Sequence, residues 1–314
     1  MNGEYILLER EGVVAFLDTC STLLDRELAG ITLKIKPKEL SDAVAYGLES
    51  KGKRIRPAVA ILSCLAVGGS ISDAKKVALS AELVHTSSLV LDDVIDKAEK
   101  RRGRDTIHTI WGENIALLTI ELLISLALRA ALGDVRLTEA ISKSLFFMGE
   151  GEAIELVNVP RDEKSYLDLA LRKTGALFGA SAFMGAVVGG GDDDSIENLE
   201  QFGNHLGIAF QIQDDILDCV SSEEDLGKPV RQDLFMGRPS IVLIDAINSG
   251  VEKSEMLLCN NGELMDLLSD SIEYARGLAA SEIAIAKEYL QMVDESRWRR
   301  QLESLCDYIV NRDR

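Results

Sequence analysis

The chain has 314 residues, 46% hydrophobic and 27% charged, so it is long enough to bury a sizeable core. Its 34 Lys and Arg residues stand against 52 Asp and Glu residues, a net charge of −18. That charge argues against general binding of nucleic acid or of an anionic membrane, because both need a basic surface.

The cysteines and the N-terminal segment give expectations about the compartment. Five scattered cysteines without a CxxC pair argue against a disulfide framework or a zinc site and favour a reducing interior. The opening MNGEYILLEREG has acidic residues where a secretory signal needs a basic start and an apolar core. The longest apolar run, 115–128, is interrupted by polar residues, which is typical of a buried helix and not of a membrane span. We expect a soluble, cytoplasmic protein.

Helical patterns fill most of the chain. Only five prolines occur, none of them between Pro57 and Pro160, and apolar residues recur at three- and four-residue spacings. No segment alternates like a strand, and no repeat or low-complexity linker divides the chain. The prediction is one all-α domain over 1–314, a bundle of about ten or more helices. The expected helices span 4–29, 39–50, 53–68, 72–95, 113–132, 137–157, 163–189, 195–219, 238–249, 263–292 and 296–311.

Two DDxxD motifs stand inside apolar runs, SSLVLDDVID and IAFQIQDDILD. Positions i and i+4 share a helix face, so the outer carboxylates of each motif repel each other unless a cation lies between them. Oxygen ligands without His or Cys favour Mg²⁺, with Mn²⁺ as a substitute, and Mg²⁺ leaves positions for substrate phosphates. The sequence therefore predicts a diphosphate held through Mg²⁺ between two helices, at Asp92, Asp93, Asp96, Asp214, Asp215 and Asp218.

Basic residues cluster at two places in this acidic chain. GKRIRP, at residues 52–57, places three cations at a probable helix start, where backbone N–H groups also favour anions. KRRGR follows the first aspartate motif closely. His85 lies two helical turns before Asp92 on nearly the same face, and we expect it to bind an anion. His108 and His205 are interpreted as structural, and Asp192–Asp194 as a cap of the next helix.

These motifs in this order resemble those of the trans-isoprenyl diphosphate synthases, or polyprenyl synthetases, in particular the geranylgeranyl and longer-chain enzymes. The resemblance runs from about residue 45 to about residue 245, through GKRIRP, ELVHTSSLVLDDVID, RRG, RKTGALFGA, LGIAFQIQDDILD, and DLGKP followed by QDLFMGRPS. It implies an all-α bundle around a deep central cavity, in a homodimer. The implied reaction joins isopentenyl diphosphate head-to-tail to an allylic diphosphate that ionises with the help of Mg²⁺.

The resemblance also implies roles for particular residues. The implied ligands of isopentenyl diphosphate are Lys53, Arg56, His85 and Arg102. The implied contacts of the allylic diphosphate are Arg101, Lys173, Thr174, Gln211 and Lys228. Thr174 and Gln211 would lie beside the reacting carbons. The implied Mg²⁺ ligands are Asp92, Asp93, Asp96 and Asp214, with Asp215 and Asp218 in support.

The chain departs from the family pattern at several positions of the site. Leu91 stands where many members have a histidine, and Glu152 and Glu155 replace the common Gln and Asp. Arg238 replaces a common lysine. These departures indicate a divergent branch, and none of them removes a metal ligand or a principal phosphate-binding cation.

In the family, the residues four and five positions before the first aspartate motif form the floor under the growing chain. Here they are Ser88 and Ser87. Two small side chains predict a product of geranylgeranyl length or longer. The alternative floor residues are Val84, Phe146 and Phe147.

Two other functions remain open from the sequence. A class I terpene cyclase would also bind Mg²⁺ and a diphosphate, but it has no use for a second diphosphate site such as GKRIRP with His85. A regulatory subunit of a heteromeric prenyl synthase would be catalytically weak, although such subunits usually lose one aspartate motif. Co-purification with an active homologue would distinguish it.

Overall fold

The computed structural model describes residues 12–32, 34–49, 52–157, 159–220 and 232–311. In the first half the elements are α2 (Val13–Thr32), α3 (Lys38–Leu48), α4 (Ile55–Ala66), α5 (Ile71–Ile95), β1 (Lys100–Arg101), β2 (Arg104–Asp105), α6 (Ile107–Trp111), α7 (Glu113–Ala130) and α8 (Val135–Val157). In the second half they are α9 (Glu163–Ala170), the π-helix η1 (Leu171–Gly175), α10 (Ala176–Gly189), α11 (Asp193–Val220), α13 (Gln232–Met236), α14 (Ile241–Asn248), α15 (Lys253–Leu258), α16 (Asn261–Leu267), α17 (Ser269–Gln291) and α18 (Arg297–Val310).

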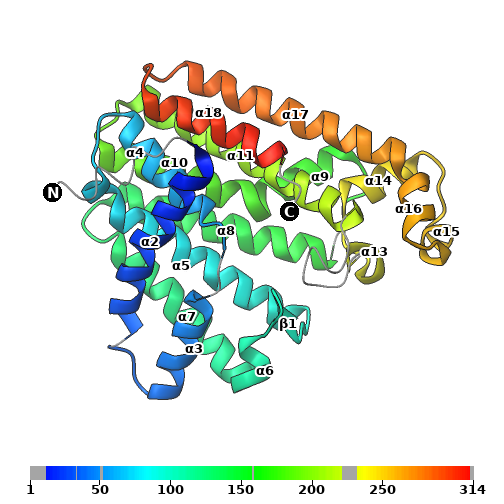
Figure 1. Cartoon of the computed structure of the whole chain (residues 1–314). Coiled ribbons are helices and arrows are strands. Elements are labelled where there is room, and N and C mark those ends of the chain that lie inside the picture. The colour runs from blue at the N-terminus through cyan, green and yellow to red at the C-terminus, as the bar shows by residue number, and fades with distance from the viewer. Residues whose placement is uncertain (1–11, 33, 50–51, 158, 221–231, 312–314) are drawn as a thin grey trace.

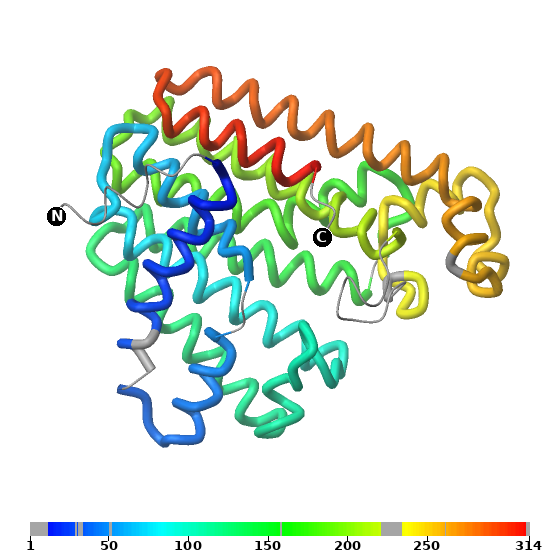
Figure 2. Tube along the Cα trace, viewed as in Figure 1, coloured from blue at the N-terminus to red at the C-terminus, as the bar shows by residue number. Residues whose placement is uncertain are grey.

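Helix α10 lies inside the bundle. It packs against α4, α5, α8 and α11 and is buried along most of its length (Figure 1). Helices α17 and α18 run antiparallel along one edge, where α17 covers α11 (Figure 2). The helices that carry the two aspartate motifs, α5 and α11, are therefore both held by the inner helix α10.

Glycines allow the inner helices to approach closely. A methyl group on Gly185 of α10 would lie 2.1 Å from the carbonyl oxygen of Ala60 on α4. A methyl group on Gly203 of α11 would lie 2.5 Å from the carbonyl oxygen of Phe178 on α10. Neither distance leaves room for a side chain, so these glycines set the spacing of α4, α10 and α11.

The buried apolar side chains form two main clusters. The larger one joins α2, α4, α5, α10 and the C-terminal α18, and the other joins α9, α14 and α16. Helices α11 and α17 contribute to both: Phe202 and Leu290 to the first, Ile212 and Ala275 to the second. These two long helices therefore connect the cores.

The all-α prediction is confirmed, and the differences are local. The predicted helix 163–189 is interrupted by the π turn η1, and the predicted helix 263–292 is divided into α16 and α17 at Leu268. The expectation of no strands is wrong at one short antiparallel hairpin, β1–β2. Asp192 accepts a hydrogen bond from the backbone N–H of Ser195 at 2.8 Å, which confirms that this acidic loop caps α11.

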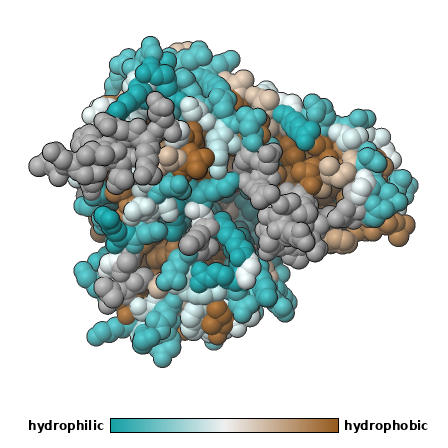
Figure 3. Space-filling model, in the orientation of Figure 1, coloured by the Kyte–Doolittle hydropathy of each residue, from teal (hydrophilic) through white to brown (hydrophobic). Residues whose placement is uncertain are grey.

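Polar side chains cover most of the face seen in Figure 3, and apolar side chains gather toward the end that holds α14 to α16. Leu258 on α15 is 87% exposed there. Among the helices of the described ranges, none is long and apolar enough to cross a membrane. All five cysteines are free thiols.

Candidate active site

A cavity of about 870 Å³ lies between α5 on one side and α8, η1 and α11 on the other. The polarity of the lining side chains changes along both α5 and α8. On α5, Ser88 lies one turn before the acidic Asp92, and on α8 the apolar Met148 lies one turn before the acidic Glu152. Ile124 of α7 lines the same cavity. The cavity therefore has an acidic part beside the aspartate motifs and an apolar part beyond them.

The first aspartate motif ends α5. Asp92 and Asp93 lie in its last turn, and Asp96 is its C-cap residue. Burial raises the pKa of Asp92 to about 6; Lys173 opposes this shift and Glu152 adds to it. Asp93 accepts a hydrogen bond of 2.7 Å from Nε of Arg101, yet burial still raises its pKa. The cations near this motif, Lys173 and Arg101, therefore compensate the negative charge of its carboxylates only in part.

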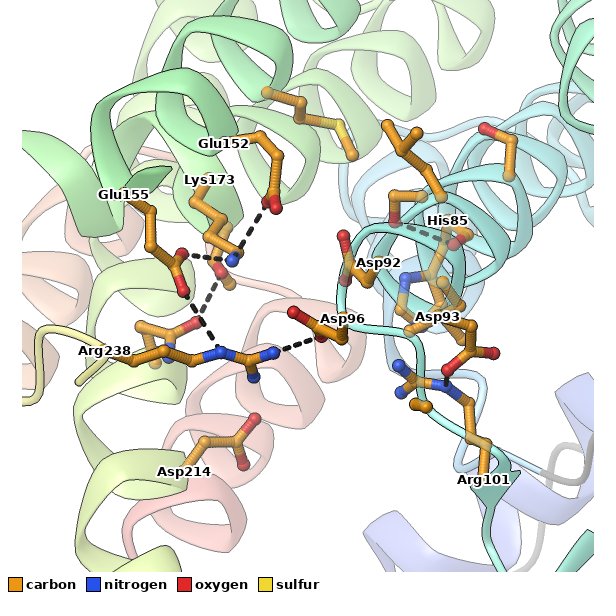
Figure 4. A pocket seen from close by; sticks show the side chains of 18 of the residues that line it. His85, Asp92, Asp93, Asp96, Arg101, Glu152, Glu155, Lys173, Asp214 and Arg238 are labelled. Atoms are coloured by element: carbon orange, nitrogen blue, oxygen red, sulfur yellow. Dashed lines mark hydrogen bonds and ion pairs between the residues drawn. The ribbon is translucent and has the colours of Figure 1, made fainter. Parts of the chain in front are cut away.

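Two carboxylates of α8 hold Lys173. Its ammonium pairs with Glu155 and lies 3.0 Å from Glu152 (Figure 4). Burial alone would lower the pKa of Lys173, but Glu155, Glu152 and Asp92 raise it overall, so the side chain is a cation. Lys173 stands in the π turn η1, and such turns often re-aim side chains at functional sites.

A hydrogen-bonded chain runs from η1 into α11. The hydroxyl of Thr174 donates to the side-chain oxygen of Gln211 at 2.7 Å, and the Gln211 amide donates to Asp215 at 3.0 Å. The other oxygen of Asp215 accepts from the Tyr166 hydroxyl at 2.7 Å and from the backbone N–H of Ile241 at 3.0 Å. Asp215 is thus held by protein donors on both of its oxygens.

Asp214 differs from its neighbour Asp215. Asp215 is 2% exposed and Asp218 is 4% exposed, whereas Asp214 is exposed and projects toward the cavity from α11 (Figure 4). In the same view Asp92 and Asp96 lie on the other wall, on the side of α5. The second motif therefore presents one carboxylate openly and keeps two inside the fold.

His85 and Arg56 form the basic part of the cavity wall. Nε2 of His85 lies 3.3 Å from Nη1 of Arg56. A guanidinium only donates, so Nε2 accepts and the neutral ring carries its proton on Nδ1. Burial lowers the pKa of His85 well below its usual value, and Arg56 and Arg102 lower it further. The imidazole is therefore neutral, and Arg56, whose guanidinium lies 4.6 Å from the ring centre of Phe178, supplies the charge.

The carboxylates fit Mg²⁺ in the manner expected when substrate completes the coordination. Within the described ranges no group of three or more His, Cys, Asp or Glu side chains converges on one point that could hold an ion. Asp92, Asp96 and Asp214 instead offer oxygen ligands from two walls of one cavity. Mg²⁺ is commonly held by one or two carboxylates, with phosphate oxygens and waters in the other positions.

Most of the predicted site residues line this one cavity. The lining includes Arg56, His85, Ser87, Ser88, Asp92, Asp93, Asp96, Arg101, Arg102, Lys173, Thr174, Gln211, Asp214, Asp215 and Asp218. Lys228 lies outside the described residues.

Lys53 is not brought to the cavity. Its side chain is exposed, and its ammonium lies 5.3 Å from the ring centre of Tyr308 on α18. The reason is the backbone of the next residue: Arg54 has a φ of +50° and turns its side chain inward, to Glu82 and to the carbonyl oxygen of Leu48 at 2.7 Å. Lys53 therefore points to the outside at the start of α4.

Three charged residues of the lining, Glu152, Glu155 and Arg238, are departures from the family pattern in the sequence. Glu152 and Glu155 hold Lys173, and Arg238 forms an ion pair with Asp96 across the cavity. Their charges inside a GEAIE stretch and a GRPS stretch were the only signal in the sequence. Their partners lie on other helices, so the pairing itself had no local signature.

The floor prediction is changed in one respect. Ser87 and Ser88 do line the cavity, with their hydroxyls donating to backbone carbonyls of their own helix. None of the alternatives Val84, Phe146 and Phe147 lines it, and Phe146 is 63% exposed. The apolar side chains that line the cavity from α7 and α8 are Ile120, Ile124, Leu145 and Met148.

Comparison with known proteins agrees with this geometry. The polyprenyl synthetase family model matches residues 37–275. A short chain isoprenyl diphosphate synthase of Methanothermobacter thermautotrophicus is 34% identical over 96% of this chain and 99% of its own. The crystal structure of a geranylgeranyl pyrophosphate synthetase from Pyrococcus horikoshii has a TM-score of 0.87 at 34% identity, over 96% of this chain and 98% of that one.

A second similar structure was determined with ligands. It is a polyprenyl synthase from Caulobacter crescentus complexed with calcium and isoprenyl diphosphate, with a TM-score of 0.84 at 28% identity, over 96% of this chain and 95% of that one. The family model covers most of this chain, and the relatives match it nearly end to end. The chain therefore belongs to the polyprenyl synthetase family.

Proposed function

We propose that this protein is a prenyltransferase that joins isopentenyl diphosphate head-to-tail to an allylic diphosphate and makes an all-trans polyprenyl diphosphate. The observation that carries the proposal is the cavity itself. It brings the aspartates of α5 and α11 to the same space as Lys173 and Arg101, and its apolar part continues from there. Such a space suits a diphosphate with a hydrocarbon tail.

The first step breaks the bond between C1 of the allylic substrate and its diphosphate oxygen. Negative charge then collects on the departing diphosphate, where Lys173 and Arg101 stabilise it, together with Lys228. The positive charge on the allyl group lies beside Thr174 and Gln211, whose oxygens present the negative ends of their dipoles. Thr174 donates to Gln211, so its own lone pairs remain available to the cation.

The second step forms the new carbon–carbon bond. The double bond of isopentenyl diphosphate attacks the allylic C1, and the proton lost from C2 of the isopentenyl unit passes to the departed diphosphate. No protein nucleophile takes part in this sequence. The apolar walls contributed by α7 and α8 keep water away from the cation, which would otherwise be hydrolysed.

We propose Mg²⁺ as the metal, with Mn²⁺ as a substitute. When bound, it neutralises charge on the leaving diphosphate and holds it between the helices. Asp92, Asp96 and Asp214 are the proposed direct ligands, because their carboxylates line the cavity from two walls. Asp93 and Asp215 serve through their hydrogen bonds to Arg101 and Gln211, and buried Asp218 supports the same helix face.

Arg56, Arg102 and His85 form the proposed site for isopentenyl diphosphate, whereas Lys53 points away from the cavity at the start of α4. The neutral imidazole of His85 donates through Nδ1–H, and the two arginines supply charge. His85 lies on the far side of Asp92 from Lys173 in Figure 4, as two separate diphosphates require.

The wider setting is also a proposal. One domain over 1–314 is supported by α11 and α17, which share both core clusters. A homodimer is supported by the exposed apolar side chains of Leu117 and Leu118 on α7. A location in the cytoplasm is supported by the five cysteines, none of which forms a disulfide. Size-exclusion chromatography coupled to light scattering measures the molar mass and so tests the dimer.

The experiment that tests the activity is product analysis. Purified protein is incubated with Mg²⁺, labelled isopentenyl diphosphate and separate dimethylallyl, geranyl, farnesyl or geranylgeranyl diphosphate primers, and the products are dephosphorylated and resolved by chromatography. We expect chains of geranylgeranyl length or longer, abolished by a chelator. Folded protein that elongates no primer contradicts the proposal and makes a regulatory subunit the better interpretation. Cyclic hydrocarbons without elongation would identify a terpene cyclase.

A further inference from the structure

Arg101 and Arg102 reach the cavity on a very short hairpin. Each strand has two residues, and Arg102 and Gly103 between them have φ angles of +53° and +74°. Two central residues with positive φ are the pattern of a type I′ turn. An isolated hairpin of this length is not stable in water, so contacts with the rest of the protein must hold it in place.

Tyr46, on α3, holds the second strand of the hairpin. Its hydroxyl donates a 2.7 Å hydrogen bond to the backbone carbonyl of Asp105, and the guanidinium of Arg104 lies 4.0 Å from the centre of its ring. The edge of Trp111 packs on the same ring, with the centroids 5.3 Å apart. Tyr46 itself is absent from the cavity lining.

Gly52 receives the guanidinium of Arg102. A methyl group on Gly52 would lie 3.0 Å from Nη1 of Arg102 and 3.5 Å from its Nη2, so the guanidinium rests against the Gly52 backbone. Gly52 directly precedes the basic segment that begins α4. Burial lowers the pKa of Arg102, and the charges of Glu82 and Asp214 oppose that shift.

We propose that Tyr46 and Gly52 are positioning residues: together they set where the guanidinium of Arg102 lies, and thereby the affinity for isopentenyl diphosphate. The inference rests on the proposed role of Arg102 as a ligand of that diphosphate. Tyr46 anchors the strand after the turn, and the missing side chain at Gly52 leaves room for the guanidinium. Charge-assisted hydrogen bonds depend strongly on distance and angle, so a small displacement of Arg102 weakens them.

Two small substitutions test the proposal. Gly52→Ala adds one methyl group that pushes the far end of a flexible side chain, and Tyr46→Phe removes one hydrogen bond but keeps the ring. For each we expect the KM for isopentenyl diphosphate to rise roughly threefold to tenfold, the size of one weakened bond to a charged group. The kcat should change by less than about twofold, and the melting temperature by only a few degrees.

Matched controls carry the same chemical changes elsewhere. Gly277→Ala adds a methyl group in open space on α17, and Tyr274→Phe removes a hydroxyl that donates to Glu163. Neither residue lines the cavity. Both controls should leave the two KM values and kcat unchanged.

Arg102→Ala separates the two proposals. An unchanged KM for isopentenyl diphosphate in this variant overturns the role of Arg102, and with it the positioning inference. If Arg102→Ala raises this KM while Gly52→Ala and Tyr46→Phe do not, only the positioning inference is overturned.

Double variants give the sharpest result. In the Arg102→Ala background, Gly52→Ala and Tyr46→Phe should have no further effect on KM, because the group they position is gone. Additive effects in that background would show that both substitutions act through something other than Arg102, and would contradict the inference.

Discussion

Arg238 forms an ion pair with Asp96, the C-cap residue of α5, and its Nε lies 3.6 Å from Oε1 of Glu155 on α8. One guanidinium thus connects the first aspartate motif to the opposite wall of the cavity (Figure 4). This cation pairs with the carboxylate that we propose as a Mg²⁺ ligand. Metal binding must therefore compete with Arg238 for Asp96.

Replacing Arg238 should tighten metal binding to the substrate-free protein. In Arg238→Gln the competing cation is absent, and we expect Mn²⁺ to bind roughly twofold to fivefold more tightly, the range for a partly exposed ion pair. Titration calorimetry with Mn²⁺ alone measures this. Arg276→Gln, which breaks a surface pair with Glu273, is the control and should change nothing. Equal Mn²⁺ affinity in wild type and Arg238→Gln would refute the competition.

Asp92→Asn should stop turnover while keeping the fold. We expect kcat to fall by about a thousandfold or more, as when a charge-stabilising group is removed from an active site. Burial holds the pKa of Asp92 at about 6, above its unfolded value, so at neutral pH the carboxylate is unfavourable to folding. The neutral Asn should therefore keep or raise the melting temperature.

The control for Asp92→Asn is Asp194→Asn at the exposed start of α11. It should leave both turnover and melting temperature nearly unchanged. Unfolding of Asp92→Asn would instead show a structural role, and full activity would remove Asp92 from the metal site.

Chain length should respond to the small side chains on α5. Ser88→Phe places a ring in the cavity one turn before Asp92, and we expect shorter products, because the growing chain then meets a bulky wall. Ser87→Phe should act in the same direction, although Ser87 is 2% exposed and the ring will also cost stability.

The opposite change on α8 should lengthen the product. Leu145→Ala removes apolar volume from the cavity wall, and chromatography of dephosphorylated products compares the chain lengths. If the serine and leucine variants all give the wild-type product spectrum, the floor lies at other residues.

His85 predicts a pH dependence of stability. Burial lowers its pKa well below 6.5, so the unfolded chain binds a proton at a pH where the folded protein does not. The stability that the neutral His85 contributes is complete above about pH 6.5 and is lost as the pH falls toward the folded pKa. The free energy of unfolding then changes by up to about 1.4 kcal/mol per pH unit. Urea unfolding of wild type and His85→Gln between pH 5 and 7.5 measures the difference.

We expect His85→Gln to lose less stability on acidification than the wild type does. Gly277→Ala, which adds a methyl group in open space on α17 and changes no ionisable group, serves as the control and should keep the wild-type slope. Identical slopes in all three proteins would mean that His85 is protonated equally in both states.

The sequence predicted those features that depend on local spacing. Asp92 lies in the last turn of α5 and Asp96, four residues on, caps that helix, as their apolar surroundings indicated, and Asp214 and Asp218 lie four residues apart on α11. Helix periodicity follows from hydrogen bonds within one segment, so neighbouring residues determine it. The ordered motifs also predicted the family correctly, because each motif is read along the chain.

Local spacing was insufficient where the backbone departs from a regular helix. The π turn η1 around Lys173 lies inside a stretch that reads as one helix, and the positive φ of Arg54 sends Lys53 to the outside. Both departures depend on packing against other helices. A pattern that assumes 3.6 residues per turn does not contain them.

Tertiary structure alone decided which charges meet. Arg238 reaches Asp96, Lys173 reaches Glu155, and Arg102 rests on Gly52, although each pair is well separated along the chain. Amino-acid types and helix faces determined that this chain would carry two acidic helices and a set of cations. The partner of each cation depends on how closely the helices pack. That distance is set by the volumes of the core side chains and by the glycines between the helices.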